Sequence, residues 1–246
     1  MREYIGLDWA RNGWLGIILR DDGDHDFDLF PSIFSVWSNH KDADQILIDI
    51  PIGLSKNGKR ACDECTVELL KPIRHNSVFS TPVREAVYAK TLTEAKEINE
   101  EFGFSISNQA WSICLRIREV DELFNEFSGA IGRVRESHPE VCFAALNGSP
   151  MEHKKSTEEG LRERKDVLFE KDESLEALYE DVIETFVEPP SWARRVSKNG
   201  KDDVLDSLVL AYTARLSDQE QTTLPEDPEM DHSKTDPLPI EIVKPK

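Results

Sequence analysis

The sequence predicts an α/β protein built around a mixed β-sheet, and three observations support that prediction. Residues 3–32 contain apolar segments separated by short turns, as expected of antiparallel strands. A continuous apolar run at 45–54 is typical of a central strand that is buried on both faces. Amphipathic segments of helical length follow, including a long one at 108–127. Strands that alternate with helices in this way indicate an α/β fold.

The strands are expected mainly in the N-terminal part of the chain. EYIGLDWA (3–10) and GWLGIILR (13–20) should form a hairpin, and the alternating pattern of DFDLFPS (26–32) predicts a third antiparallel strand. QILIDIPIGL (45–54) should be a central parallel strand that stops at Pro51, because proline has no N–H for the ladder. We therefore predict a sheet of three antiparallel strands plus parallel strands.

Helices should cover this sheet. The expected helical segments are 60–71, 93–102, 108–127, 157–170, 173–186 and 202–214, with a further strand within 130–146. We predict a single domain at 1–216 with a helical insertion at about 55–128. The tail at 217–246 has eight acidic residues, three lysines and five prolines, a composition that predicts disorder.

The charge and the apolar content exclude some classes of function. The net charge is −18, which does not suggest a general nucleic-acid binder, although residues 53–90 and 191–201 are locally basic. The chain has no apolar run long enough to cross a membrane, and its N-terminus lacks the layout of a signal peptide. We expect a cytoplasmic protein whose four cysteines are reduced. The Cys62–Cys65 pair lacks a second ligand pair, so it is a weak zinc signal.

Acidic residues stand at the positions where a site is expected. Asp8 ends the first strand, Asp49 lies near the end of the central parallel strand, and Glu140 follows a later strand. Adjacent parallel strands bring their carboxyl ends to the same edge of a sheet, where ligand sites collect. Asp203 and Asp206 are three residues apart on the last helix, so they share a face. The five carboxylates therefore form one candidate site.

Such a cluster favours a divalent cation. Neighbouring carboxylates repel one another, and Mg²⁺ or Mn²⁺ relieves this because hard cations take oxygen ligands. Two such cations can activate water for phosphodiester cleavage, and no G-x-S-x-G or Walker-type motif offers another mechanism. A structural explanation stays open, since strand-end acids are often solvated and Asp206 is also consistent with a salt-bridged core residue.

Several motifs in order resemble a known family. They are GLDWA (6–10), IDIPIGL (48–54), SVF with PVREA (77–86), NQAW (108–111), ESHPEVCFAAL (136–146), KKSTEEGLRER (154–164) and DDVLDSLVLAYTA (202–214). Together they resemble the domain of unknown function 429 family over about residues 3–215. That family is described as predicted nucleases with a ribonuclease H-like fold. The resemblance implies this fold and, as an expectation, this activity.

The wider RuvC-like superfamily suggests roles for particular residues. Asp8 is similar to the acid on the first strand of the resolvases, and Asp203 with Asp206 is similar to their D-x-x-D pair. Asp49 stands where the resolvases have Glu, and Glu140 has no clear counterpart there. Cationic residues in the matched motifs are candidate phosphate contacts, with surface solubility or salt bridges to acidic neighbours as the alternative. They are Arg60, Arg84, Lys154, Lys155 and Arg164.

The combined expectation is a metal-dependent nuclease that acts on DNA or RNA. Asp8, Asp49, Glu140, Asp203 and Asp206 are the expected catalytic metal ligands, and Mg²⁺ or Mn²⁺ is the expected cofactor. Nucleic acid is the expected partner, without a membrane, and a homodimer is an open alternative to the monomer. Two other classes stay open. One is a non-catalytic binding or scaffold protein on the same fold. The other is an actin-like nucleotide-binding protein, which the absence of a duplicated second half disfavours.

Overall fold

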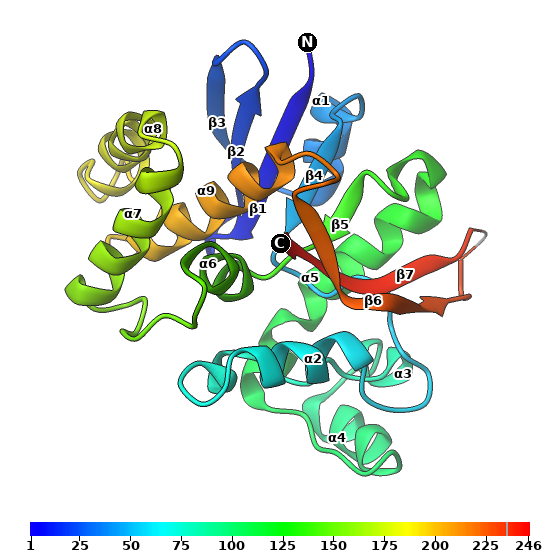
Figure 1. Cartoon of the computed structure of the whole chain (residues 1–246). Helices are drawn as coiled ribbons and strands as arrows, with labels where there is room; N and C mark the ends of the chain where they lie inside the picture. Colours follow the sequence, from blue (N-terminus) through cyan, green and yellow to red (C-terminus); the bar gives the residue numbers. More distant parts are fainter. Residues whose placement is uncertain (235) are drawn as a thin grey trace.

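A computed structural model describes residues 1–234 and 236–246, which form a five-stranded sheet and a two-stranded sheet (Figure 1). The larger sheet has the order β3-β2-β1-β4-β5. Its first three strands are antiparallel, whereas β1–β4 and β4–β5 are parallel. The expected α/β class and mixed sheet are therefore confirmed. The strands are β1 (Glu3–Trp9), β2 (Trp14–Arg20), β3 (His25–Phe30), β4 (Gln45–Ile48) and β5 (Val134–Glu136).

Some of the helices cover the two faces of this sheet, and no helix in the described ranges is both long and apolar enough to cross a membrane. After β3 the helices are α1 (Ile33–His40), α2 (Ala61–Leu69), α3 (Arg84–Val87), α4 (Leu92–Glu100), α5 (Asn108–Glu126), α6 (Pro139–Asn147), α7 (Glu158–Lys171), α8 (Ser174–Val182) and α9 (Lys201–Arg215). Short helical turns lie at η1 (His75–Ser77), η2 (Ser128–Ala130) and η3 (Ile183–Val187).

Alternation along the strands separates two hydrophobic cores. Tyr4 of β1 packs with α6, α8 and α9, whereas Ile5 and Leu7 pack with α1 and α5 on the other face. Successive side chains of a strand point to opposite faces, so even-numbered β1 residues face α9. Figure 1 shows α9 lying along the sheet, with α7 and α8 on one side of the molecule and α2 to α4 at its far end. This orientation places the side chain of Asp8 on the α9 side.

Gly6 allows α9 to approach the sheet at backbone contact. A Cβ atom at this position would lie 2.1 Å from the Ser207 carbonyl oxygen and 2.2 Å from the Ala211 nitrogen. Both atoms belong to the helix backbone, so neither moves without moving α9. The Ser207 hydroxyl also donates to the Leu15 carbonyl oxygen at 3.1 Å, which fixes the helix along β2. The position of Asp206 thus depends on the absence of a side chain at residue 6.

We expect Gly6→Ala to lower the free energy of unfolding by about 1–3 kcal/mol or more, as overpacked cores do. Gly129→Ala is the matched control, because a Cβ there meets nothing closer than a Trp37 side-chain carbon at 3.7 Å. Urea unfolding of the two variants measures the difference. Equal stability of the two variants would show that α9 tolerates displacement from β1.

The C-terminal tail corrects the sequence-based expectation of disorder at 217–246. Its strands β6 (Gln221–Asp231) and β7 (Leu238–Pro245) form an antiparallel hairpin beside α2 and β5 (Figure 1). Ile240, Ile242 and Val243 are buried. The Ser137 hydroxyl donates to the Val243 carbonyl oxygen at 2.7 Å, which connects β7 to the end of β5. The hairpin is therefore part of the folded domain, because its apolar side chains are removed from water.

Candidate active site

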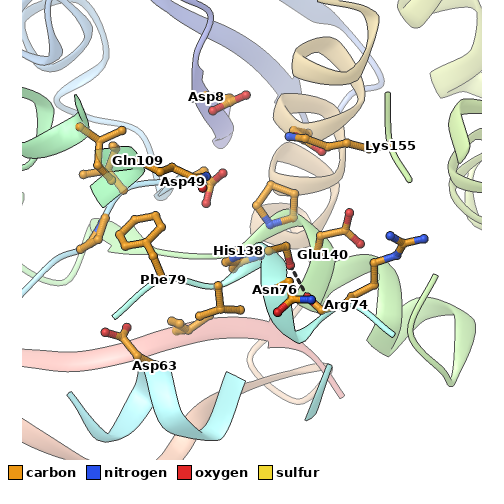
Figure 2. A pocket seen from close by; sticks show the side chains of 18 of the residues that line it. Asp8, Asp49, Asp63, Arg74, Asn76, Phe79, Gln109, His138, Glu140 and Lys155 are labelled. Atoms are coloured by element: carbon orange, nitrogen blue, oxygen red, sulfur yellow. Dashed lines mark hydrogen bonds and ion pairs between the residues drawn. The ribbon is translucent and has the colours of Figure 1, made fainter. Parts of the chain in front are cut away.

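A pocket of about 540 Å³ lies at the carboxyl ends of β1 and β4 (Figure 2). Asp8 and Asp49 line it from the sheet, Asp206 from α9, and Glu140 from the first turn of α6. Phe79, Asn76 and Gln109 line it from the helical segment between β4 and β5. The pocket therefore lies between the sheet edge and the helical insertion, and its size is typical of ligand sites.

Strand register brings Asp8 and Asp49 together. Leu7 pairs with Ile48 in the parallel β1–β4 ladder, and the Asp49 amide donates to the Leu7 carbonyl oxygen at 3.1 Å. Asp8 and Asp49 follow this pair directly, so their Cα atoms should lie roughly 5 Å apart, the spacing of neighbouring strands. Ile48 belongs to the core on the α1–α5 face, so Asp49, the next residue, points to the α9 face as Asp8 does.

The charges at this edge affect one another. Burial raises the pKa of Asp8 well above its usual range, and the negative charges of Asp49 and Asp206 raise it further. Burial and then the charge of Asp206 raise the pKa of Asp49 to about 7. Burial, Asp202 and Asp206 together raise the pKa of Asp203 to about 7. Asp8, Asp49 and Asp206 therefore line one pocket and affect one another's charge, whereas Asp203, one turn before Asp206 on α9, is not among the residues that line it.

Lys155 supplies the positive charge of this cluster. Its ammonium nitrogen lies 2.5 Å from the Asp206 carboxylate, in the loop between α6 and α7. The charge of Asp206 raises the pKa of Lys155, and the charges of Asp8 and Asp49 raise it further. Lys154 lines the same pocket and is exposed. The two lysines predicted to contact phosphate are thus at the carboxylate cluster.

A family model described as protein of unknown function (DUF429) matches residues 6–230, which include the five site carboxylates. The chain belongs to the DUF429 family. No curated protein and no solved structure matches the chain.

In this DUF429 protein the three arginines predicted to contact phosphate are held in ion pairs. Arg164, which is fully buried, donates to Glu140 at 2.5 Å. Arg60, which is 1% exposed, lies between Asp63 at 2.5 Å and Glu136 at 2.7 Å. These two arginines match the salt-bridge alternative.

Arg84 is also held in ion pairs with acidic residues. It donates to Asp121 at 2.7 Å and to Asp231 of the C-terminal hairpin at 2.5 Å. This arginine therefore joins the helical insertion to the hairpin. A structural role accounts for the contacts of all three arginines. Of the predicted cations, Arg60, Lys154 and Lys155 line the pocket.

His138, which lies in the matched ESHPEVCFAAL motif, also lines the pocket, although no role was predicted for it. It precedes Pro139 at the start of α6, and its Nδ1 atom is buried without a hydrogen-bond partner within the described residues. The Oε2 atom of Glu140 is likewise buried and unpartnered within them. Burial lowers the pKa of His138, so the imidazole is neutral at pH 7. The position of His138 between β5 and α6, beside Glu140, was the sequence signal for it.

The DUF429 carboxylates fit a hard divalent cation by their chemistry. Asp8, Asp49, Asp203 and Asp206 offer oxygen ligands whose repulsion a cation would relieve, and the free Oε2 of Glu140 adds another. Within the described ranges, only Cys62, Asp63 and Glu136 place three candidate ligand atoms within 4.8 Å of one another. Binding of one cation by three of the aspartates would therefore need their side chains to rotate.

The Cys62, Asp63 and Glu136 group is not the better metal site. The guanidinium of Arg60 already bonds to both carboxylates. Burial also raises the pKa of Cys62, so its thiol stays protonated and is a poor metal ligand. The positive charge that these two carboxylates bind is therefore the guanidinium of Arg60. The Cys62–Cys65 spacing was likewise only a weak zinc signal in the sequence.

Proposed function

We propose that this protein is a metal-dependent phosphodiesterase that cleaves DNA or RNA, with Mg²⁺ or Mn²⁺ as cofactor, on a ribonuclease H-like fold. The observation that supports it most is the convergence of Asp8, Asp49 and Asp206. They come from the ends of β1 and β4 and from α9; burial together with the charge of Asp206 raises the pKa of both Asp8 and Asp49. Buried like charges destabilise a fold, so their concentration in a pocket favours a functional site over a structural one.

The residues of the pocket have distinct roles in this proposal. Asp8, Asp49, Asp203 and Asp206 would hold the cations, with Glu140 beside them. When bound, the cations supply an activated water and neutralise the charge that develops on phosphate oxygens.

The basic and neutral residues position the substrate. The ammonium of Lys155, which pairs with Asp206 at the pocket, would neutralise a phosphate oxygen of the substrate. Lys154 contacts a neighbouring phosphate, and neutral His138 offers Nδ1 for a hydrogen bond to the substrate. Together they hold the phosphodiester against the carboxylates of Asp8, Asp49 and Asp206, which we call the carboxylate edge.

The Lys155–Asp206 ion pair favours one alternative, a non-catalytic binding protein, because it neutralises Asp206 without a cation. One experiment separates the two functions. Protein treated with a chelator is incubated with labelled single-stranded DNA, single-stranded RNA and duplex DNA, with Mg²⁺, Mn²⁺ or EDTA. The nuclease proposal expects cleavage of at least one substrate that either cation supports and EDTA abolishes. Calorimetry with Mn²⁺ alone measures cation binding separately, and absence of both signals would leave the binding protein as the better explanation.

The raised pKa values predict how pH and Mg²⁺ together affect stability. Asp49 and Asp203 titrate at about 7 in the folded protein, above their ordinary value, so they bind more protons when folded. Their contribution to stability is present at acidic pH and is lost as pH rises through 7. Mg²⁺ binds the deprotonated carboxylates, so it should raise the melting temperature more at pH 8 than at pH 6. Thermal unfolding with and without Mg²⁺ measures this, and an equal shift at both pH values would contradict it.

A further inference from the structure

Trp192 is the most exposed aromatic side chain among the large exposed hydrophobic residues of the described chain, at 86%. It lies in the segment between η3 and α9. Residues 189–201 contain Arg194, Arg195, Lys198 and Lys201 and no acidic residue, although the chain as a whole has a net charge of −18. We call Arg11, Trp192, Arg194, Arg195 and Lys198 the Trp192 surface. Its local charge is opposite to that of the protein.

The backbone around Trp192 is anchored. The amides of Arg195 and Val196 donate to the Phe186 carbonyl oxygen at 3.1 Å and 3.0 Å, and the side chain of Val196 is buried. The Arg194 Nε atom donates to the Val187 carbonyl oxygen at 2.8 Å. The indole is therefore presented to solvent from a fixed turn, which reduces the conformational entropy lost when a partner binds.

The cations of this surface are only weakly engaged. Arg195 has an ion pair with Asp28 at 3.3 Å, in which both side chains are more than half exposed, so the pair stabilises little. Arg11 and Lys198, which are exposed, have no ion pair within the described residues. Their charges are therefore available to an anionic partner.

The Trp192 surface adjoins the carboxylate edge. The Asn12 side chain donates to the Arg195 carbonyl oxygen at 3.4 Å, which joins the β1–β2 turn to the segment. Asn12 follows Asp8 by four residues, so their Cα atoms are at most about 14 Å apart. At its other end the segment leads into α9, where a Cβ on Gly200 would lie 2.9 Å from the Asp203 carboxylate. A nucleic-acid single strand of a few nucleotides is therefore long enough to reach from the Trp192 surface to the carboxylate edge.

We propose that the Trp192 surface binds single-stranded nucleic acid and leads it to the pocket. An unpaired base stacks on the indole of Trp192, while Arg11, Arg195 and Lys198 neutralise phosphates along the strand. Aromatic platforms beside cations bind single strands because every unpaired base offers a π-face, whereas a duplex keeps its bases stacked internally. The inference deepens the proposed function by naming its substrate class, single strands, and its binding component is testable without catalysis.

Fluorescence anisotropy in EDTA, with a labelled twelve-nucleotide oligothymidine and a labelled duplex hairpin as probes, tests the binding. Trp192→Ala should weaken single-strand binding about tenfold, since one base stack contributes about 1–3 kcal/mol, and Trp192→Phe should restore much of it. Arg195→Ala should reduce the slope of log affinity against log salt by about one. Leu115→Ala is the control, because Leu115 is 62% exposed on α5 outside this surface. It should bind like the wild type.

A second measurement separates this inference from the proposed function. Hydrolysis of bis(p-nitrophenyl) phosphate, which is too small to span both places, should be the same in Trp192→Ala and the wild type. If Trp192→Ala loses single-strand binding while the wild type shows no metal-dependent hydrolysis, that result would support the Trp192 surface as a binding site and reject the proposed nuclease activity. Equal binding by Trp192→Ala and Leu115→Ala, no binding by the wild type, or equally tight Trp192-dependent binding of the duplex would each overturn the inference. The first two outcomes would leave protein docking as the explanation of the exposed indole.

Discussion

Asp8→Asn is expected to reduce metal-dependent hydrolysis by more than about a hundredfold, while the metal-free protein becomes more stable. Even outer-shell partners of metal ligands change activity by about 10–100-fold, so loss of a ligand should have a larger effect. The amide has nearly the shape of the carboxylate but no charge. It therefore removes a buried charge that Asp49 and Asp206 repel. Activity and stability should move in opposite directions, as expected of a functional residue.

Asp206→Asn provides the internal comparison. It should reduce hydrolysis about as much as Asp8→Asn does. It should also destabilise the protein, because Lys155 loses the carboxylate that lies 2.5 Å from its ammonium nitrogen. Asp42→Asn, at an exposed acid outside the pocket, should change neither property. Hydrolysis rates and urea unfolding without metal measure both effects. Wild-type activity in Asp8→Asn, or a loss of stability as large as that of Asp206→Asn, would count against a metal-binding role.

The second large effect concerns the fold. Arg60→Leu should lower the free energy of unfolding by about 3–5 kcal/mol, the usual effect of leaving buried charges without their partner. Arg60 is the cation between Asp63 and Glu136, and it also donates to the Ile52 carbonyl oxygen at 3.2 Å. Glu136 titrates at about 7 because burial outweighs the favourable charge of Arg60. Without that charge, both carboxyl groups are buried with no cationic partner.

Two controls make this prediction specific, both measured by urea unfolding. Arg2→Leu removes an exposed arginine that pairs with Asp21, and it should leave stability unchanged. Adding Asp63→Asn and Glu136→Gln to Arg60→Leu should recover much of the lost stability, because the uncompensated charges are removed together. A triple variant as unstable as Arg60→Leu would show that the shape of the guanidinium matters more than its charge.

Local patterns in the sequence predicted the carboxylate edge. Apolar runs located β1 and β4, and their parallel pairing places Asp8 and Asp49 next to one another. The D-x-x-D spacing placed Asp203 and Asp206 on one face of α9. What the sequence did not show is how closely α9 approaches β1, where a Cβ on Gly6 would meet the backbone of Ser207. A glycine inside a strand was the only signal for that contact.

Partner choice could not be read from the sequence. Arg60 pairs with Glu136, which is 76 residues away, and Arg84 pairs with Asp231, which is 147 residues away. A motif shows that an arginine is present but not which of many acids it meets. Phosphate binding and a salt bridge require the same residue type, so only tertiary structure distinguishes them.

The C-terminal hairpin was not predicted from the sequence, because the composition of residues 217–246 was given more weight than their alternating apolar pattern. Prolines and acidic residues between 217 and 246 predicted disorder, yet Leu238, Ile240 and Ile242 alternate with other residues as in a half-buried strand. Asp231 is also internally satisfied, since it accepts from the Leu54 amide at 3.0 Å and from Arg84. Period-two alternation was the signal for β7, and the acidic count concealed it.

The position of α9 on β1 has a consequence for synthesis of the chain. The first strands emerge from the ribosome at once, but the helix that covers them ends only at Arg215, and the Gln45 side chain meets Gln221 later still. One face of the nascent sheet therefore remains apolar and uncovered through most of translation. Contacts of such long sequence separation form slowly and leave strands open to aggregation. The carboxylates of Asp8, Asp49 and Asp206 come together only after this closure, so the site cannot assemble before the residues of α9 have been synthesised.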